Sequence, residues 1–175
     1  MRVLLAAALA ACVTTSTVAQ GMPDSYRDVQ LRMLDTQRSM LLAMADSMPE
    51  DLYRDKVTPI QRDFAQQIHH CASAMAFIAA RYFDAEMPAL PDTGTTFNSR
   101  DGLRAYLNGA YDFAEGVLRD QPAGDRETVV NFFGQMEIPK WQIWDEIHQH
   151  TIWTAGQVVA NFRKHGMAPP PFLFF

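Results

Sequence analysis

Length, composition and charge are those of a chain that folds as one domain around a substantial apolar core. The 175 residues are 48% hydrophobic and carry a net charge of −5, so a single domain can bury enough apolar surface to be stable. An acidic chain is poorly suited to nucleic acid or to an anionic lipid surface, and we expect neither as a partner.

Residues 1–19 have the pattern of a secretory signal peptide. A short positive start precedes an almost continuously apolar run over residues 3–13, and Ala19 ends a small-residue cleavage site. The run is shorter than the ~20 residues that span a membrane. We therefore expect no transmembrane span and an exported protein, periplasmic or extracellular, whose single domain covers residues 20–175. In a second interpretation the segment is a lipoprotein signal, and Cys12 carries the lipid.

Four amphipathic helical patterns follow, separated by breaks rich in proline and glycine. Thr58 and Gln61 predict a capping box at the start of the second helix, with Pro59 in its first turn. Gly166 predicts the end of the fourth helix, after two basic residues in its last turn. The patterns cover residues 24–48, 58–83, 99–118 and 140–166.

The links between these patterns are long. Residues 88–98 are rich in Pro, Thr and Gly, and within the link 119–139 residues 128–133 predict a short extended segment. No strand-rich region competes with the helices. The sequence therefore predicts an all-α fold, a four-helix bundle with long inter-helix links.

Five histidines are the main candidates for chemistry, because histidines that face each other across helices can build a metal site inside a bundle. On the fourth helix, Glu146, His150 and Thr154 share one face at spacings of four. His148 lies about 200° around that helix from His150 and cannot point into the same site. On the second helix, His69 and His70 diverge by about 100°, and we expect His70 to face inward.

Other residues near these positions have structural interpretations. Cys71 falls on the apolar stripe of the second helix and predicts a buried core thiol. Gly156 predicts the close approach of a neighbouring helix. Gln157 either hydrogen-bonds near the site or is exposed to solvent. The apolar tail 171–175 either docks on the bundle or binds a partner, and Met40 with His150 offers a remote option for haem.

Three stretches together resemble the DinB-like superfamily of four-helix proteins, which includes the YfiT type and bacterial thiol transferases. His70 lies in a segment similar to the family's second helix, Phe64–Ala74. The stretch His150–Gln157 lies on the family's H-x-x-x-H-x-G-Q motif, and Asn161–Pro170 is similar to its ending. The stretch Asn131–Gly134 also matches the segment before the fourth helix. The resemblance covers most of the chain and implies a DinB/YfiT-type bundle.

The resemblance also implies a divalent metal, zinc or nickel, held by one histidine of the second helix and two of the fourth. The corresponding positions are His70, His150 and Thr154, and a neutral threonine is a poor ligand for a transition metal. We therefore expect a degenerate two-His site with weak or absent metal. Two arrangements would complete it: Glu146 as a carboxylate ligand, or a water held by Thr154.

Two functions follow from these expectations. The first is a metal-dependent hydrolase or thiol transferase acting on a small molecule. The alternative is a non-catalytic binding or structural bundle that has lost its metal. A homodimer is compatible with either function.

Overall fold

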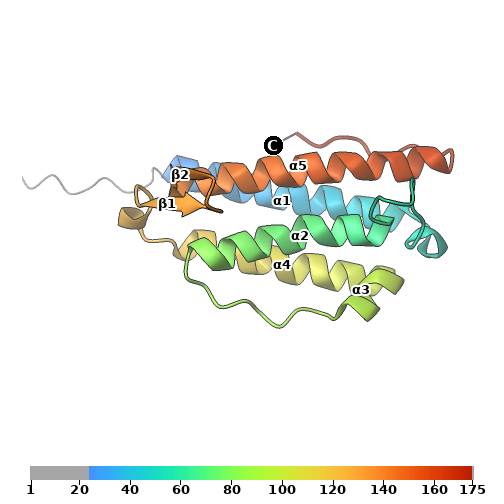
Figure 1. Ribbon diagram of the computed structural model, residues 1–175, viewed down its shortest axis with the longest axis horizontal. Helices are drawn as coiled ribbons and strands as arrows, with labels where there is room; N and C mark the ends of the chain where they lie inside the picture. Colours follow the sequence, from blue (N-terminus) through green and yellow to red (C-terminus); the bar gives the residue numbers. More distant parts are fainter. Residues whose placement is uncertain (1–23, 175) are drawn as a thin grey trace, which may run out of the picture.

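Four long helices form an elongated bundle in the computed structural model of the protein, which describes residues 24–174 (Figure 1). Around the bundle α2 packs against α4 and α5, and α1 packs against the same two helices. The all-α prediction is confirmed. The signal-peptide prediction for residues 1–19 lies outside the described residues. The long helices are α1 (Asp24–Ser47), α2 (Phe64–Tyr82), α4 (Arg100–Asp120) and α5 (Lys140–Lys164).

The start of α2 differs from the prediction. Asp63, not Thr58, is the N-cap: its side chain accepts a hydrogen bond from the Gln66 N–H, and the Gln66 side chain accepts one from the Asp63 N–H. The chain before Asp63 is turned, and Ile60, expected on the buried face, is 99% exposed. The predicted start of the helix at Thr58 is therefore wrong by about one and a half turns, because a second capping box, at Asp63 and Gln66, is the one that forms.

Short elements fill the links. The sequence did not predict α3 (Thr93–Asn98), which Asp92 caps through the Thr95 N–H. The extended segment is confirmed as β1 (Val129–Phe132), and it pairs antiparallel with an unpredicted β2 (Met136–Pro139). Two 3₁₀ turns, η1 (Glu50–Leu52) and η2 (Ala123–Asp125), lie in other links.

The end of α5 agrees with its sequence signal. Gly166 adopts φ 69°, a left-handed conformation that suits glycine. Its N–H donates to the Arg163 carbonyl and that of Met167 to the Phe162 carbonyl, the pair of bonds of a Schellman motif. The chain then turns back along α5 as a short tail (Figure 1).

The core is continuous and draws on all four long helices. Cys71 is fully buried within it, and burial raises the pKa of its thiol to about 12, so the thiol is inert as predicted. No helix within residues 24–174 is long and apolar enough to cross a membrane. The largest fully buried side chains include Leu34, Tyr53, Met75, Leu107, Tyr111, Trp144 and Phe162.

One packing prediction is wrong. A Cβ placed on Gly156 would meet no atom within 4 Å, so no neighbouring helix approaches closely there. Gly156 instead lines an apolar groove beside α1, together with Met40, Ile152 and Phe172. The tail residues therefore lie over the seam between α1 and α5, which fits the docking interpretation of the tail.

Candidate functional site

His70 of α2 and His150 of α5 meet where these two helices pack together. Their ring centroids are 5.1 Å apart and the rings are nearly perpendicular, at 78°. Burial, Arg62 and His150 lower the pKa of His70 to about 4, and burial and Arg62 lower the pKa of His150. Both imidazoles are therefore neutral at pH 7, and a neutral imidazole has the lone pair that binds metals.

Thr154 lies one turn after His150, beside the pair. Its side chain is buried, and its Oγ1 is 3.5 Å from His150 Nε2. Its backbone carbonyl accepts a hydrogen bond of 3.2 Å from Gln67 Nε2. The structure thus brings His70, His150 and Thr154 together, and the third of these positions offers only a hydroxyl.

Glu146 lies one turn before His150, and both residues line a hollow beside the β1–β2 hairpin. Its Oε1 accepts a hydrogen bond of 3.3 Å from Gln142 Nε2. Across the described residues 24–174, no group of three or more His, Cys, Asp or Glu side chains is arranged to hold a metal ion. The arrangement offers two imidazoles, with a carboxylate nearby but not in a three-ligand set.

The other two helical histidines face elsewhere. His69 packs its ring against Phe97 and Tyr106, with centroids 5.1 and 4.2 Å away. His148 is only 2% exposed and its Nε2 is 2.5 Å from Gln30 Oε1, on α1. His148 thus faces away from His150, as the helical spacing predicted, but into the protein and not into solvent.

A polar hollow, here called the Arg62 hollow, opens near the pair on the side of the loop before α2. Its volume is about 620 Å³. Gln67 donates to the Gln157 side chain at 3.4 Å, which links α2 to α5 along this hollow. Gln157 is thus hydrogen-bonded beside the hollow and is also exposed to solvent. The lining residues are Thr58, Ile60, Gln61, Arg62, Gln67 and Gln157.

A second hollow, here called the aromatic hollow, contains His150 itself. Its volume is about 400 Å³, and the tip of the β1–β2 hairpin forms one side of it. The sequence did not predict this hollow, although Asn131–Gly134 resembles the family's segment before the fourth helix. The lining residues are Ile78, Phe132, Phe133, Glu146, Gln149, His150 and Trp153.

An acidic hollow at the ends of α2 and α4 contains neither His70 nor His150. Two of its carboxylates already have structural partners: Asp112 pairs with Arg38 at 2.9 Å, and Asp125 pairs with Lys140 at 2.9 Å. We therefore take the histidine pair as the candidate site.

Comparison with known proteins identifies the family of the chain. The sequence model of the DinB superfamily matches residues 33–152, a stretch that includes His70 and His150 and stops before Thr154. The match covers more than half of the chain, and the chain therefore belongs to the DinB superfamily. Searches of curated proteins and of solved structures gave no match.

Proposed function

We propose that this member of the DinB superfamily is an exported protein that binds zinc or nickel weakly between His70 and His150. We further propose that the loaded site acts as a hydrolase or thiol transferase on a small molecule. The observation that supports the proposal is the pair of neutral imidazoles, 5.1 Å apart at the seam of α2 and α5.

Two of the three side chains at the site, the imidazoles of His70 and His150, are suitable ligands for a divalent ion. Imidazole is a suitable ligand for zinc and nickel, whereas the neutral hydroxyl of Thr154 is a poor one. A divalent metal in such a site supplies Lewis acidity, which lowers the pKa of a bound water or thiol. Thr154 can hold a water through its hydroxyl, and the Gln67 amide holds α2 against α5 beside the pair.

The alternative is a bundle that has lost its metal and serves as a binding or structural module. Thr154 in place of a histidine favours this alternative, because a catalytic zinc site normally has three protein ligands.

Metal titration of the purified protein separates these functions. We expect weak binding of zinc or nickel in wild type by calorimetry, and loss of this binding in His70→Ala. We expect Thr154→His to bind at least about tenfold more tightly, a gain of ~1.4 kcal/mol. The matched control is His69→Ala, because His69 packs against Phe97 and Tyr106 and should leave the affinity unchanged.

Each other outcome has a clear consequence. Stoichiometric, tight zinc or nickel in wild type that His70→Ala abolishes would show a complete site and overturn the degenerate one. No binding in wild type, with binding created by Thr154→His, would support the alternative function. If a folded Thr154→His protein gains neither affinity nor thermal stability from added metal, the three-position assignment is wrong.

A further inference from the structure

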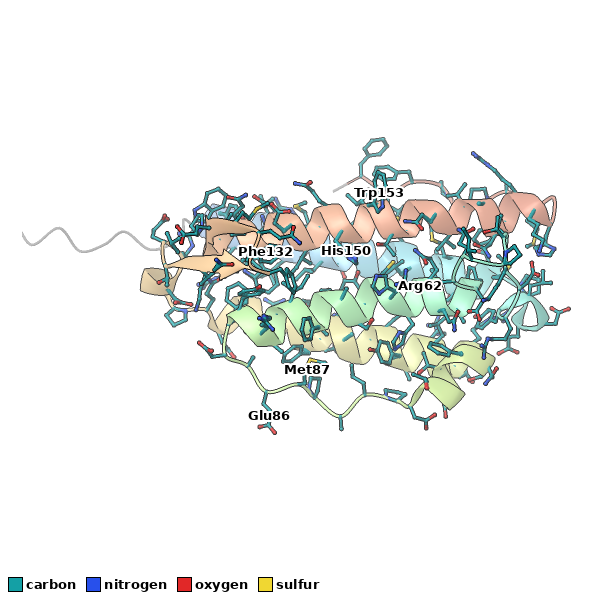
Figure 2. All side chains as sticks on the ribbon, in the orientation of Figure 1. Arg62, Glu86, Met87, Phe132, His150 and Trp153 are labelled. Carbon is teal, nitrogen blue, oxygen red and sulfur yellow. The ribbon has the colours of Figure 1, made fainter. Side chains whose placement is uncertain are left out.

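We propose that the protein has a second binding site, enclosed by α1, α5 and the C-terminal tail, for a small uncharged molecule that is apolar apart from one hydroxyl group, such as a phenol. The site lies away from the histidine pair and does not depend on the proposed function. Figure 2 shows His150 at the edge of α5 that faces α2, whereas the tail runs along the other edge of α5 (Figure 1). The space under the tail is here called the tail cavity.

The tail cavity is apolar on every side. Its volume is about 140 Å³, and all the side chains that line it are hydrocarbon or thioether groups. An apolar cavity of about 150 Å³ stays dry and binds small apolar molecules such as benzene. The tail cavity therefore suits one small ring better than it suits water. Its walls include Met40 and Met44 of α1, Ile152 and Val159 of α5, and Pro171 and Phe172 of the tail.

Gly156 helps to keep this cavity open. It lines the cavity from α5, and a Cβ placed on it would meet no atom of the described residues within 4 Å. Glycine inside a helix is less favourable than alanine, and no neighbouring helix requires it here. The absence of a side chain at this position leaves space that a ligand can use.

A smaller cavity adjoins the tail cavity and leads to Gln37 of α1. The two cavities share Met40, Ile152 and Phe172 as lining residues, so both lie beneath the same part of the tail. The smaller one has a volume of about 10 Å³, and a single water-sized group needs roughly 10–15 Å³. It therefore has room for one polar group of a ligand whose ring fills the tail cavity.

Gln37 supplies the polar partner for that group. Its side chain is only 2% exposed, and neither its Oε1 nor its Nε2 has a hydrogen-bond partner among residues 24–174. A buried amide without partners lowers stability. A ligand hydroxyl can donate to Oε1 or accept from Nε2. No charged side chain lines either cavity, so a charged ligand would lose its hydration without gaining an ion pair.

Calorimetry with three probes of similar size tests the inference on the metal-free protein. The probes are p-cresol, toluene, which lacks the hydroxyl, and benzoate, which carries a charge. We expect p-cresol to bind more tightly than either of the others. No binding of p-cresol, or equal or tighter binding of toluene or benzoate, would overturn the inference.

Two variants locate the probe. Gly156→Leu places a side chain in the tail cavity and should weaken p-cresol at least about tenfold, or ~1.4 kcal/mol, while leucine favours the helix. Gln37→Leu keeps an apolar side chain of similar size and should weaken p-cresol about tenfold but not toluene. Circular dichroism confirms that both variants fold. Wild-type affinity for p-cresol in either folded variant would overturn the assignment.

The matched controls lie in the aromatic hollow, on another side of α5. Gln149→Leu removes an exposed glutamine and Trp153→Ala an exposed ring, and both should bind p-cresol like wild type. Loss of p-cresol binding in these variants would place the probe in the aromatic hollow and overturn the inference. Metal affinity, titrated without probe, reports separately on the proposed function.

Discussion

His148 shows how far the role of a histidine depends on the side of the helix that it occupies. Two residues away, His150 faces α2, whereas His148 faces α1 and contacts Gln30. The Gln30 amide nitrogen donates to Asp145 at 2.8 Å, so its oxygen accepts and His148 Nε2 carries the proton. The Tyr26 hydroxyl also donates to Asp145, at 3.2 Å. These four side chains form a polar network between α1 and α5.

This network predicts a pH-dependent stability. Burial lowers the pKa of His148 to about 4, from 6.5. The unfolded chain therefore takes up a proton near pH 6.5, and the folded chain does so only near pH 4. The contribution of His148 is complete above pH 6.5 and is lost as the pH falls to about 4, by up to roughly 3 kcal/mol.

Urea unfolding of wild type and His148→Gln at pH 7, 5.5 and 4.5 checks this expectation. The glutamine amide can still donate to Gln30 but does not titrate, so the variant should lose less stability between pH 7 and 4.5. A smaller slope should persist, because the pKa of His70 is also lowered to about 4. Parallel pH profiles of the two proteins would show that His148 is not the titrating group.

At the scale of single elements, the start of α2 is fixed by contacts on both sides of its cap. Asp63 accepts the Gln66 N–H at 2.8 Å and pairs with Arg54 at 2.8 Å. The Ala65 N–H donates to the carbonyl of the buried Tyr53, at 2.9 Å. The helix therefore begins where the incoming loop has anchored it, and Thr58 lies outside.

Two alanine variants distinguish the two capping signals. Asp63→Ala removes the cap and the partner of Arg54, and should lower the free energy of unfolding by about 1–2 kcal/mol. Thr58→Ala should change it by less than ~0.5 kcal/mol, because Thr58 is exposed and does not cap the helix. Chemical denaturation measures both values. Equal losses in the two variants would place the start of the helix back at Thr58.

The features that the sequence predicted are those with a local cause. Gly166 and the basic residues before it set the end of α5, and helical spacing separated His148 from His150. The superfamily resemblance supplied Thr154 as the third position. The capping-box pattern occurs twice, at Thr58 and at Asp63. Only tertiary contacts, such as that between the Ala65 N–H and the Tyr53 carbonyl, determine which of the two residues caps the helix.

Features without a local signal were missed. α3 lies in a segment rich in Thr and Gly, and β2 ends in Pro139, which cannot donate to a strand ladder. The aromatic hollow depends on contacts between residues distant in sequence, such as the Phe133 N–H with the Tyr82 hydroxyl. A single sequence without related sequences gives no indication of such contacts.

At the scale of the whole molecule, α5 packs against two helices, α2 and α1, and the two interfaces carry different features. Along α2 it carries His150 and Glu146 and contributes residues to the Arg62 hollow and the aromatic hollow. Along α1 it leaves an apolar groove, in which Met40 and Ile152 lie beside the tail residue Phe172. The tail thus covers apolar surface on the interface that does not hold the histidine pair.

Substitutions in the tail should therefore affect stability and leave metal binding unchanged. Phe172 is 56% exposed and Phe174 is 90% exposed. Loss of the buried part of the first ring in Phe172→Ala should lower the free energy of unfolding by about 1 kcal/mol, whereas Phe174→Ala should change it by less than ~0.5 kcal/mol. Denaturant unfolding measures the difference, and metal titrations should match wild type for both variants. A change in metal affinity in Phe172→Ala would mean that the tail and the histidine pair are coupled through α5.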